Sequence, residues 1–192
     1  ADIGDNAMRN GATADARSSV QVYRFPEPAV GEDRSAPASL RVRPDVLTLT
    51  YPDGPHDAET LLVDPVGGDL LIVTKDWSRS GSSGVYRAPA GLAGGSTTRL
   101  ERVGDVPLPA GTLVTGGDVS PDGTVVALRS YADVRLYRRE PRTPAWSAFD
   151  GAPCLGPARV ELKGEALGFA ADGASYVTVS EGARPVLHAT SP

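Results

Sequence analysis

Cysteine is scarce in this sequence, and long apolar runs are missing. Cys154 is the only cysteine in 192 residues, so no disulfide can form within the chain. A single thiol fits a reducing cytoplasm, and it also fits many exported bacterial proteins. No stretch approaches the roughly 18 apolar residues that a membrane-spanning helix needs. The sequence therefore predicts no membrane span.

Excess positive charge is also missing. Lysine and arginine number 19 against 24 acidic residues, for a formal net charge of −5. The basic residues are scattered, apart from a cluster at Arg135, Arg138 and Arg139. Nucleic-acid-binding domains usually carry a basic patch or stripe. We therefore predict no nucleic-acid partner.

The motifs of common nucleotide-binding and hydrolytic sites do not occur. The chain has no G-x-G-x-x-G fingerprint, no P-loop and no H-E-x-x-H. Gly81-Ser82-Ser83-Gly84 lacks the G-x-S-x-G order of a nucleophile elbow and is typical of a flexible turn. Helical periodicity is almost absent, because the alanine-rich segments 6–16 and 88–93 are interrupted by glycine or proline.

Glycine and proline, in contrast, are abundant and regularly spaced. The 22 glycines and 17 prolines separate short apolar runs, a pattern typical of many strands joined by turns. One run, ending in an aromatic-basic pair, recurs with central residues 63, 51 and 50 positions apart. Its copies are Val22-Tyr23-Arg24, Val85-Tyr86-Arg87, Leu136-Tyr137-Arg138 and a degenerate Val186-Leu187-His188.

A second repeat consists of glycine-containing hairpins. Glycine supplies the positive φ that two-residue hairpin turns demand. The three copies are Val66-Gly67-Gly68, Pro121-Asp122-Gly123 and Ala171-Asp172-Gly173. The runs before them (60–63, 113–119, 166–169) and after them (70–74, 125–128, 176–179) are predicted strands.

The two repeats interleave into a unit of four strands. Its order is strand A, hairpin, strand B, loop, strand C ending in Tyr-Arg, and a weaker strand D, expected at 46–51, 98–103 and 159–162. Four antiparallel strands per roughly 50 residues are typical of a propeller blade. We predict an all-β, single-domain β-propeller with blade segments at approximately 1–55, 56–107, 108–162 and 163–192. A β-sandwich is the alternative, but it does not explain the repeat.

The phase of the repeat predicts an incomplete ring. The first unit lacks strand A and most of B, and the last lacks D, which leaves about three and a half of six blades. A six-bladed ring at this period needs roughly 250 to 300 residues. We expect a missing N-terminal part of the same propeller to be a partner of this segment, because open sheet edges are prone to aggregation.

An ordered set of motifs along nearly the whole chain carries a family resemblance. The set is Asp2-Ile3-Gly4-Asp5-Asn6, Val22-Tyr23-Arg24-Phe25-Pro26-Glu27-Pro28, Asp57-Ala58-Glu59-Thr60-Leu61-Leu62, Gly117-Asp118-Val119-Ser120-Pro121-Asp122-Gly123 and Gly164-Glu165-Ala166-Leu167. It resembles bacterial, often actinobacterial, exported six-bladed β-propeller proteins of unknown function. More distantly, it is similar to calcium-dependent lactonase and esterase-like propellers and to TolB-like propellers. The resemblance implies a secreted or cell-surface location.

Blade geometry predicts where chemistry is possible. The start of strand A and the end of strand B lie at the same end of a blade, opposite the hairpin. Glu59 and Glu165 occupy near-equivalent positions at the starts of two A strands, and Lys75 and Arg129 follow or end two B strands. We therefore expect one mouth of the central channel to carry these four residues together with Asp2, Asp5 and Asn6.

Two interpretations of this mouth compete. Asp2, Asp5, Asn6, Glu59 and Glu165 are candidate ligands of Ca²⁺, which takes six to eight oxygen ligands. Alternatively, Lys75 and Arg129 neutralise Glu59 and Glu165 in an ion-paired ring. The Asp-Ile-Gly-Asp-Asn run also has a purely local interpretation, since Asp and Asn shape loops by bonding nearby backbone.

Other candidates are few. Lys75, Trp77 and Arg129 are the candidate ligand-binding residues at the mouth. His56 is the candidate general base, although such a histidine is commonly just exposed. We expect Trp146 to pack between blades, and packing also explains the repeated tyrosines Tyr23, Tyr86 and Tyr137.

Two functions follow from these expectations. The first is a non-catalytic binding or scaffold propeller that holds a small-molecule or protein partner on one face of the channel. The alternative is a calcium-dependent hydrolase of the lactonase, esterase or phosphoesterase type, with acidic residues at the channel mouth and His56 nearby.

Overall fold

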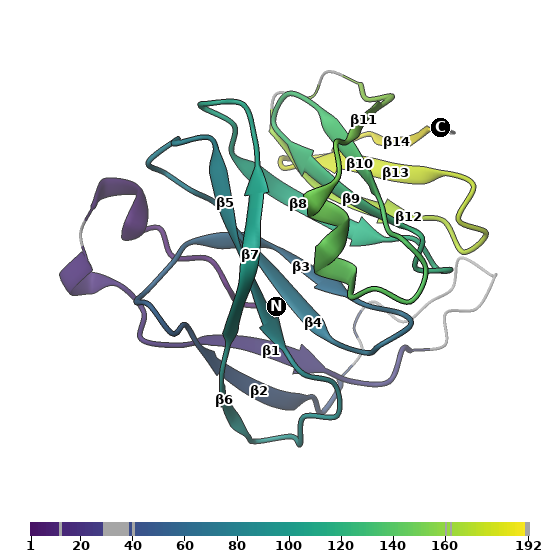
Figure 1. The fold of residues 1–192 in the computed structure, drawn as a ribbon. Coiled ribbons are helices and arrows are strands. Elements are labelled where there is room, and N and C mark those ends of the chain that lie inside the picture. Colours follow the sequence, from purple (N-terminus) through teal and green to yellow (C-terminus); the bar gives the residue numbers. More distant parts are fainter. Residues whose placement is uncertain (12, 29–38, 40, 160, 162, 191–192) are drawn as a thin grey trace.

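The fold is all-β, in a computed structural model that describes residues 1–11, 13–28, 39, 41–159, 161 and 163–190. Within these ranges the chain forms four sheets whose neighbouring strands are antiparallel, except for one parallel pair (Figure 1). The helices are short 3₁₀ segments at Met8–Asn10, Thr13–Asp15 and Ala145–Asp150. No helix in the described ranges is long and apolar enough to cross a membrane. The predicted all-β class is confirmed.

The second and third sheets each contain four strands in the predicted order. The second sheet has the order β3-β4-β5-β7 and the third has the order β8-β9-β10-β11. The bounds in the second sheet are Ala58–Val63, Leu70–Thr74, Ser82–Ala88 and Glu101–Pro107. Those in the third are Val114–Val119, Val125–Ser130, Val134–Arg138 and Cys154–Gly156.

The first and fourth sheets each contain three strands. The first has β1 (Val20–Arg24), β2 (Asp45–Thr50) and β6 (Thr97–Arg99), and an isolated bridge joins Asp2 to Gln21 in β1. The fourth has β12 (Gly164–Phe169), β13 (Tyr176–Ser180) and β14 (Leu187–Thr190).

The segment predicted as one strand over 98–103 forms two strands in different sheets. β6 pairs in parallel with β2, and β7 pairs with β5. Leu100 lies between them, where it is buried and donates its N–H to Thr50 O at 2.8 Å. This buried residue fixes the point at which the chain passes from the first sheet to the second.

The third sheet corrects the prediction of a strand over 159–162. Its outer strand is β11, which pairs with β10, whereas Arg159 and Glu161 lie outside any strand and 160 and 162 lie outside the described residues. Gly156 explains the position, because a Cβ there would lie 2.6 Å from Tyr176 Oη and 3.2 Å from Val134 Cγ1. A larger residue at this position would require the Tyr176 side chain to move aside.

The hairpins also differ from the prediction. The turn glycines Gly68, Gly123 and Gly173 do have positive φ. However, the strands are joined by four-residue loops, since Ser120 N bonds Val125 O and Gly123 N bonds Ser120 O. Such loops are built around a tight turn followed by one left-handed residue, so the glycine is needed although the loop is longer.

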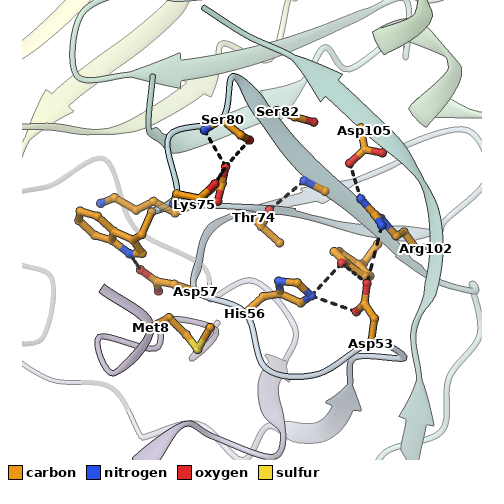
Figure 2. Close-up of a pocket in the computed structure, with 15 residues that line it drawn as sticks. Met8, Asp53, His56, Asp57, Thr74, Lys75, Ser80, Ser82, Arg102 and Asp105 are labelled. Carbon is orange, nitrogen blue, oxygen red and sulfur yellow. Dashed lines mark hydrogen bonds and ion pairs between the residues drawn. The ribbon is translucent and has the colours of Figure 1, made fainter. Parts of the chain in front are cut away.

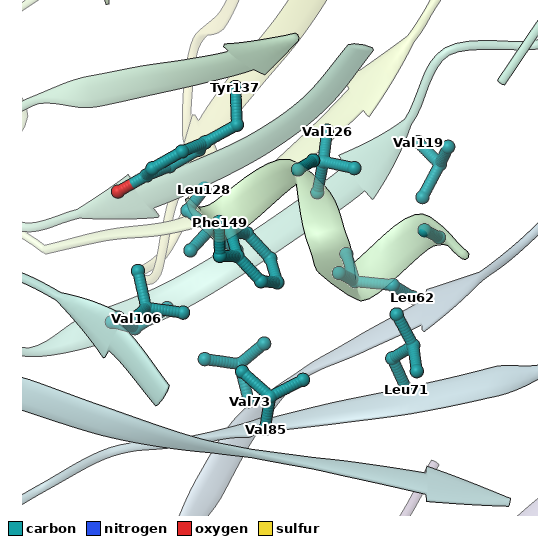
Figure 3. Packing of buried hydrophobic residues seen from close by; sticks show 13 residues of the cluster. Leu62, Leu71, Val73, Val85, Val106, Val119, Val126, Leu128, Tyr137 and Phe149 are labelled. Carbon is teal, nitrogen blue, oxygen red and sulfur yellow. The ribbon is translucent and has the colours of Figure 1, made fainter. Parts of the chain in front are cut away.

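Side chains alternate between the two faces of each sheet and fill three apolar clusters. In β4, Leu71 and Val73 face the third sheet and Ile72 faces the first. The cluster between the second and third sheets is covered by the 3₁₀ helix Ala145–Asp150, with Phe149 edge-to-face on Tyr137 at 5.1 Å (Figure 3). Burial of these apolar side chains is the main stabilising contribution.

The predicted packing roles of the aromatic residues hold in part. Trp146 packs against this cluster, and Tyr86 and Tyr137 are buried. Tyr23, however, is 40% exposed and donates its hydroxyl to Gln21. The repeat position therefore does not guarantee burial in the first sheet.

The first strands of three sheets lie side by side. β8 packs against both β3 and β12, and Thr115 Oγ1 donates to Gly164 O at 2.6 Å. A Cβ on Gly116 would lie 2.5 Å from Glu165 O, so this glycine permits the approach. The contact brings the starts of β3 and β12 to one end of the molecule.

Candidate functional site

A hollow of about 680 Å³ opens at the end where β3 and β12 begin and β4 and β9 end. Glu59 and Glu165 come from the strand starts, and Lys75 and Tyr131 follow the strand ends. Trp77, Lys163 and Glu181 lie beside them. The rest of the lining is Asn6, Arg9, Arg79, Gly111 and Leu113.

Lys75 is the buried centre of this hollow. Only 3% of the residue is exposed, and its Nζ donates to Glu59 Oε1 at 2.7 Å and to Tyr131 Oη at 2.8 Å. The ammonium also lies 5.2 Å from the Trp77 ring centroid and 4.9 Å from that of Tyr131. A buried charge requires such compensation.

Glu59 and Lys75 perturb one another. Burial raises the pKa of Glu59 to about 7, while the hydrogen bond from Lys75 opposes the rise and the neighbouring Glu165 carboxylate adds to it. Burial lowers the pKa of Lys75, but its bonds to Glu59 and Tyr131 outweigh this, and the net change is upward. Lys75 is therefore charged at neutral pH, whereas Glu59 gains or loses its proton near neutral pH.

The expected ion-paired ring is present in part. The Lys75–Glu59 pair is confirmed. Arg129 does not pair with Glu165: its Nη2 lies 3.1 Å from Glu161 Oε2, and both side chains are buried. Glu161 lies in the segment that was wrongly predicted as an outer strand over 159–162, so the repeat did not indicate it as the partner of Arg129. A Cβ on Gly164 would lie 1.9 Å from Arg129 Nη2, which leaves glycine as the fitting residue there.

The five candidate calcium ligands do not share one environment. Asp2 forms an ion pair with Arg17, with 2.6 Å between Asp2 Oδ1 and Arg17 Nη1. Asp5 is buried and accepts hydrogen bonds from the backbone N–H groups of Ala7 and Arg17. The loop-shaping interpretation of the Asp-Ile-Gly-Asp-Asn run therefore describes Asp5. Within the ranges that the structure describes, no three or more His, Cys, Asp or Glu side chains are placed to hold a metal ion.

Asn6, Glu59 and Glu165 do line the same hollow. Asp2 lines a neighbouring hollow with the two glutamates. Calcium binding at this end therefore stays a prediction. Its candidate ligands that lie together are the carboxylates of Glu59 and Glu165, which line both hollows.

A second hollow, of about 430 Å³, lies beside the first and shares Lys75 and Trp77 with it (Figure 2). His56 is part of its wall. The Nε2 of His56 is 2.9 Å from Asp53 Oδ1 and 2.9 Å from Tyr86 Oη, and Tyr86 donates to Asp53 Oδ2 at 2.8 Å. His56, named as the candidate general base, is thus part of a hydrogen-bonded network.

Several residues of these hollows were not predicted as site residues. Tyr131 follows strand β9 as Lys75 follows β4, so the repeat contained the signal for it. Asp57 is buried and joins the two loops of the site, accepting from Asp5 N at 2.6 Å and Trp77 Nε1 at 2.7 Å. Arg79 lies in the loop after β4, which the repeat directs to this end, but it was not named as a site residue. Arg9 and Lys163 come from irregular segments, for which the repeat makes no prediction.

Comparison with known proteins adds no assignment: the sequence matches no protein-family model and no curated protein.

Proposed function

We propose that the chain is a non-catalytic binding propeller, the four sheets being consecutive blades, and that the hollow around Lys75 holds a small anionic ligand. The propeller assignment is supported by the repeated strand order and by the contacts of β8 with β3 and β12. A crystal structure of the natural protein with β3, β8 and β12 around one axis would support it, and a two-layer sandwich would contradict it. The resemblance to exported propellers suggests secretion.

The charge balance of the hollow carries the ligand assignment. Four cationic and three anionic side chains line it. Glu59 pairs with Lys75 at 2.7 Å, and Glu181 pairs with Lys163 at 3.3 Å. Among the described residues, the guanidinium groups of Arg9 and Arg79 make no ion pair. After these pairs are set aside, the lining has two guanidinium groups and one carboxylate, that of Glu165. Guanidinium groups bind carboxylate and phosphate well.

Glu59 makes this preference dependent on pH. Its pKa of about 7 means that it gains a proton as pH falls through neutrality. The hollow then loses negative charge while its cations stay charged, so an anion should bind more tightly at pH 6 than at pH 8.

Calcium-dependent hydrolysis remains the alternative, supported by the adjacent Glu59 and Glu165 side chains. The oxygen ligands available here suit Ca²⁺ poorly, because Glu59 already accepts a hydrogen bond from Lys75 and a calcium site needs six to eight oxygens. Calcium that raises the melting temperature of the natural protein, with the effect lost in Glu59→Gln, would favour this alternative.

The test uses four-carbon probes of matched length in isothermal titration calorimetry. Succinate should bind, more tightly at pH 6 than at pH 8, and 1,4-butanediol should not. Arg79→Gln should weaken succinate binding about tenfold, the value of one lost charge-assisted hydrogen bond.

The matched control is Arg142→Gln. Like Arg79, Arg142 is exposed and has positive φ, but it follows β10 at the opposite end of its sheet. Equal effects of the two substitutions, or no binding of succinate, would refute the proposed anion site. Glu59→Gln should remove the pH dependence without preventing binding.

A further inference from the structure

The second hollow has a histidine whose protonated nitrogen is fixed by its neighbours. Tyr86 donates its hydroxyl hydrogen to Asp53, so both oxygens next to His56 Nε2 are available only as acceptors. The neutral imidazole must then carry its hydrogen on Nε2. Its Nδ1 therefore presents a lone pair.

That lone pair faces the hollow. In Figure 2 the second ring nitrogen of His56 points away from Asp53, into the space between His56 and Thr74. No partner for Nδ1 is present among the described residues. The ring is held in place by Tyr51 and Tyr86, whose ring centroids lie 4.9 and 5.0 Å from it.

The walls around this acceptor carry excess negative charge. Asp57, Asp76 and Asp53 line the hollow, and Arg102 is bound to Asp105 at 2.6 Å. Lys75 also lines it, but its ammonium is directed to Glu59 and Tyr131 in the neighbouring hollow. Arg102 also lies 4.0 Å from Asp53 Oδ2, so the carboxylates without a cationic partner among the described residues are those of Asp57 and Asp76. A ligand in this space meets these two carboxylates and an imidazole acceptor.

Two of the carboxylates that line the hollow are held in the charged form. Burial raises the pKa of Asp53, but the hydrogen bonds from His56 and Tyr86 outweigh it, and the net shift is downward. Burial likewise raises the pKa of Asp76, but the hydrogen bonds from Ser78 and Ser80 outweigh burial, and the net shift of this pKa is downward. The negative charge persists well below neutral pH.

From the fixed tautomer, the open acceptor and the charge of the walls, we propose that the hollow beside His56 is a second ligand site, for a small organic amine. The ammonium donates to His56 Nδ1 and is paired by the surrounding aspartates, with Tyr86 and Trp77 as aromatic walls. A volume of about 430 Å³ suits a short alkyl amine. The amine site is proposed independently of the anion site, although the two hollows share Lys75 and Trp77.

The ionisable groups that face His56 or line the same hollow are Tyr51, Asp53, Asp57, Lys75, Asp76, Tyr86, Arg102 and Asp105.

The test titrates the complete chain with putrescine, the diamine that matches 1,4-butanediol and succinate in length. Putrescine should bind and butanediol should not. Asp76→Asn and His56→Gln should each weaken putrescine binding about tenfold, and leave succinate binding unchanged. Nitrogen-15 NMR of the imidazole should show hydrogen on Nε2, and putrescine should shift the Nδ1 resonance.

Two controls distinguish the site from general attraction to an acidic protein. His188→Gln changes the only other histidine, and Asp172→Asn removes an exposed carboxylate from a hairpin loop at the opposite end of the fourth sheet. Both should keep the wild-type affinity. Loss of affinity in Asp172→Asn equal to that in Asp76→Asn, a hydrogen on Nδ1, or no binding of putrescine would overturn the proposal.

Discussion

Single residues set the distance between neighbouring strands, and Gly116 is the sharpest case. It lies in β8, where a Cβ added to it would meet the backbone oxygen of Glu165 in β12 at 2.5 Å. Backbone cannot move aside as a flexible side chain can, so a methyl group forces the two strands apart. Because Glu165 follows Gly164 at the start of β12, the displacement reaches the anion site directly.

We therefore predict that Gly116→Ala destabilises the protein by about 1–3 kcal/mol and weakens succinate binding. Urea denaturation measures the first effect. The matched control is Gly104→Ala in β7, where a Cβ meets nothing within 4 Å. A Gly116→Ala variant as stable as Gly104→Ala would show that the strands are not in close contact here.

At the same scale, the sequence predicted some site residues and missed others. Glu59, Glu165 and Lys75 occupy defined positions of the repeat, and strand geometry then brings them together. Arg129 also has such a position, but its partner Glu161 comes from a segment between strands. Side chains on irregular segments follow no period, and for that reason Arg9 and Lys163 were not predicted.

Among the elements, the 3₁₀ helix Ala145–Asp150 was not expected. It is too short to show a helical period, and its sequence Ala-Trp-Ser-Ala-Phe-Asp has no side-chain cap. Tertiary packing positions it, because Ala145, Ala148 and Phe149 are buried in the cluster between the second and third sheets. The strands that flank the three hairpins, in contrast, were predicted closely, since alternation of apolar and polar residues determines both their extent and their register. The outer strands expected at 98–103 and 159–162 were not.

We predict that Phe149→Ala destabilises the protein by about 3–5 kcal/mol, the usual cost of deleting a buried phenylalanine. The ring is 3% exposed and packs on Tyr137. Thermal and urea unfolding measure the loss. Asp150→Ala, at the exposed last position of the same helix, should change stability by less than about 0.5 kcal/mol. Equal effects would mean that the helix does not cover the cluster.

At the scale of the whole molecule, stability is distributed unevenly. The clusters on either side of the second sheet are large, whereas the cluster between the third and fourth sheets consists of Ala127, Val134, Leu167 and Tyr176 with two partly buried neighbours. Less apolar area is buried there, so local opening of the fourth sheet costs less free energy.

Native-state hydrogen exchange should therefore show faster exchange in β13 and β14 than in β4 and β9. The central strands should exchange only by global unfolding. Uniform protection across the four sheets would contradict this order.

The path of the chain through β6 has a consequence for biosynthesis. β6 completes the first sheet, yet it is about fifty residues downstream of β2, to which it pairs. On the ribosome, β2 emerges with β1 as its partner on one side but without the strand that pairs with its other edge. The nascent chain must release β3, β4 and β5 before the third strand of that sheet becomes available. Folding of the first sheet is thus delayed until the second has largely been synthesised, and the two sheets should form as one cooperative unit.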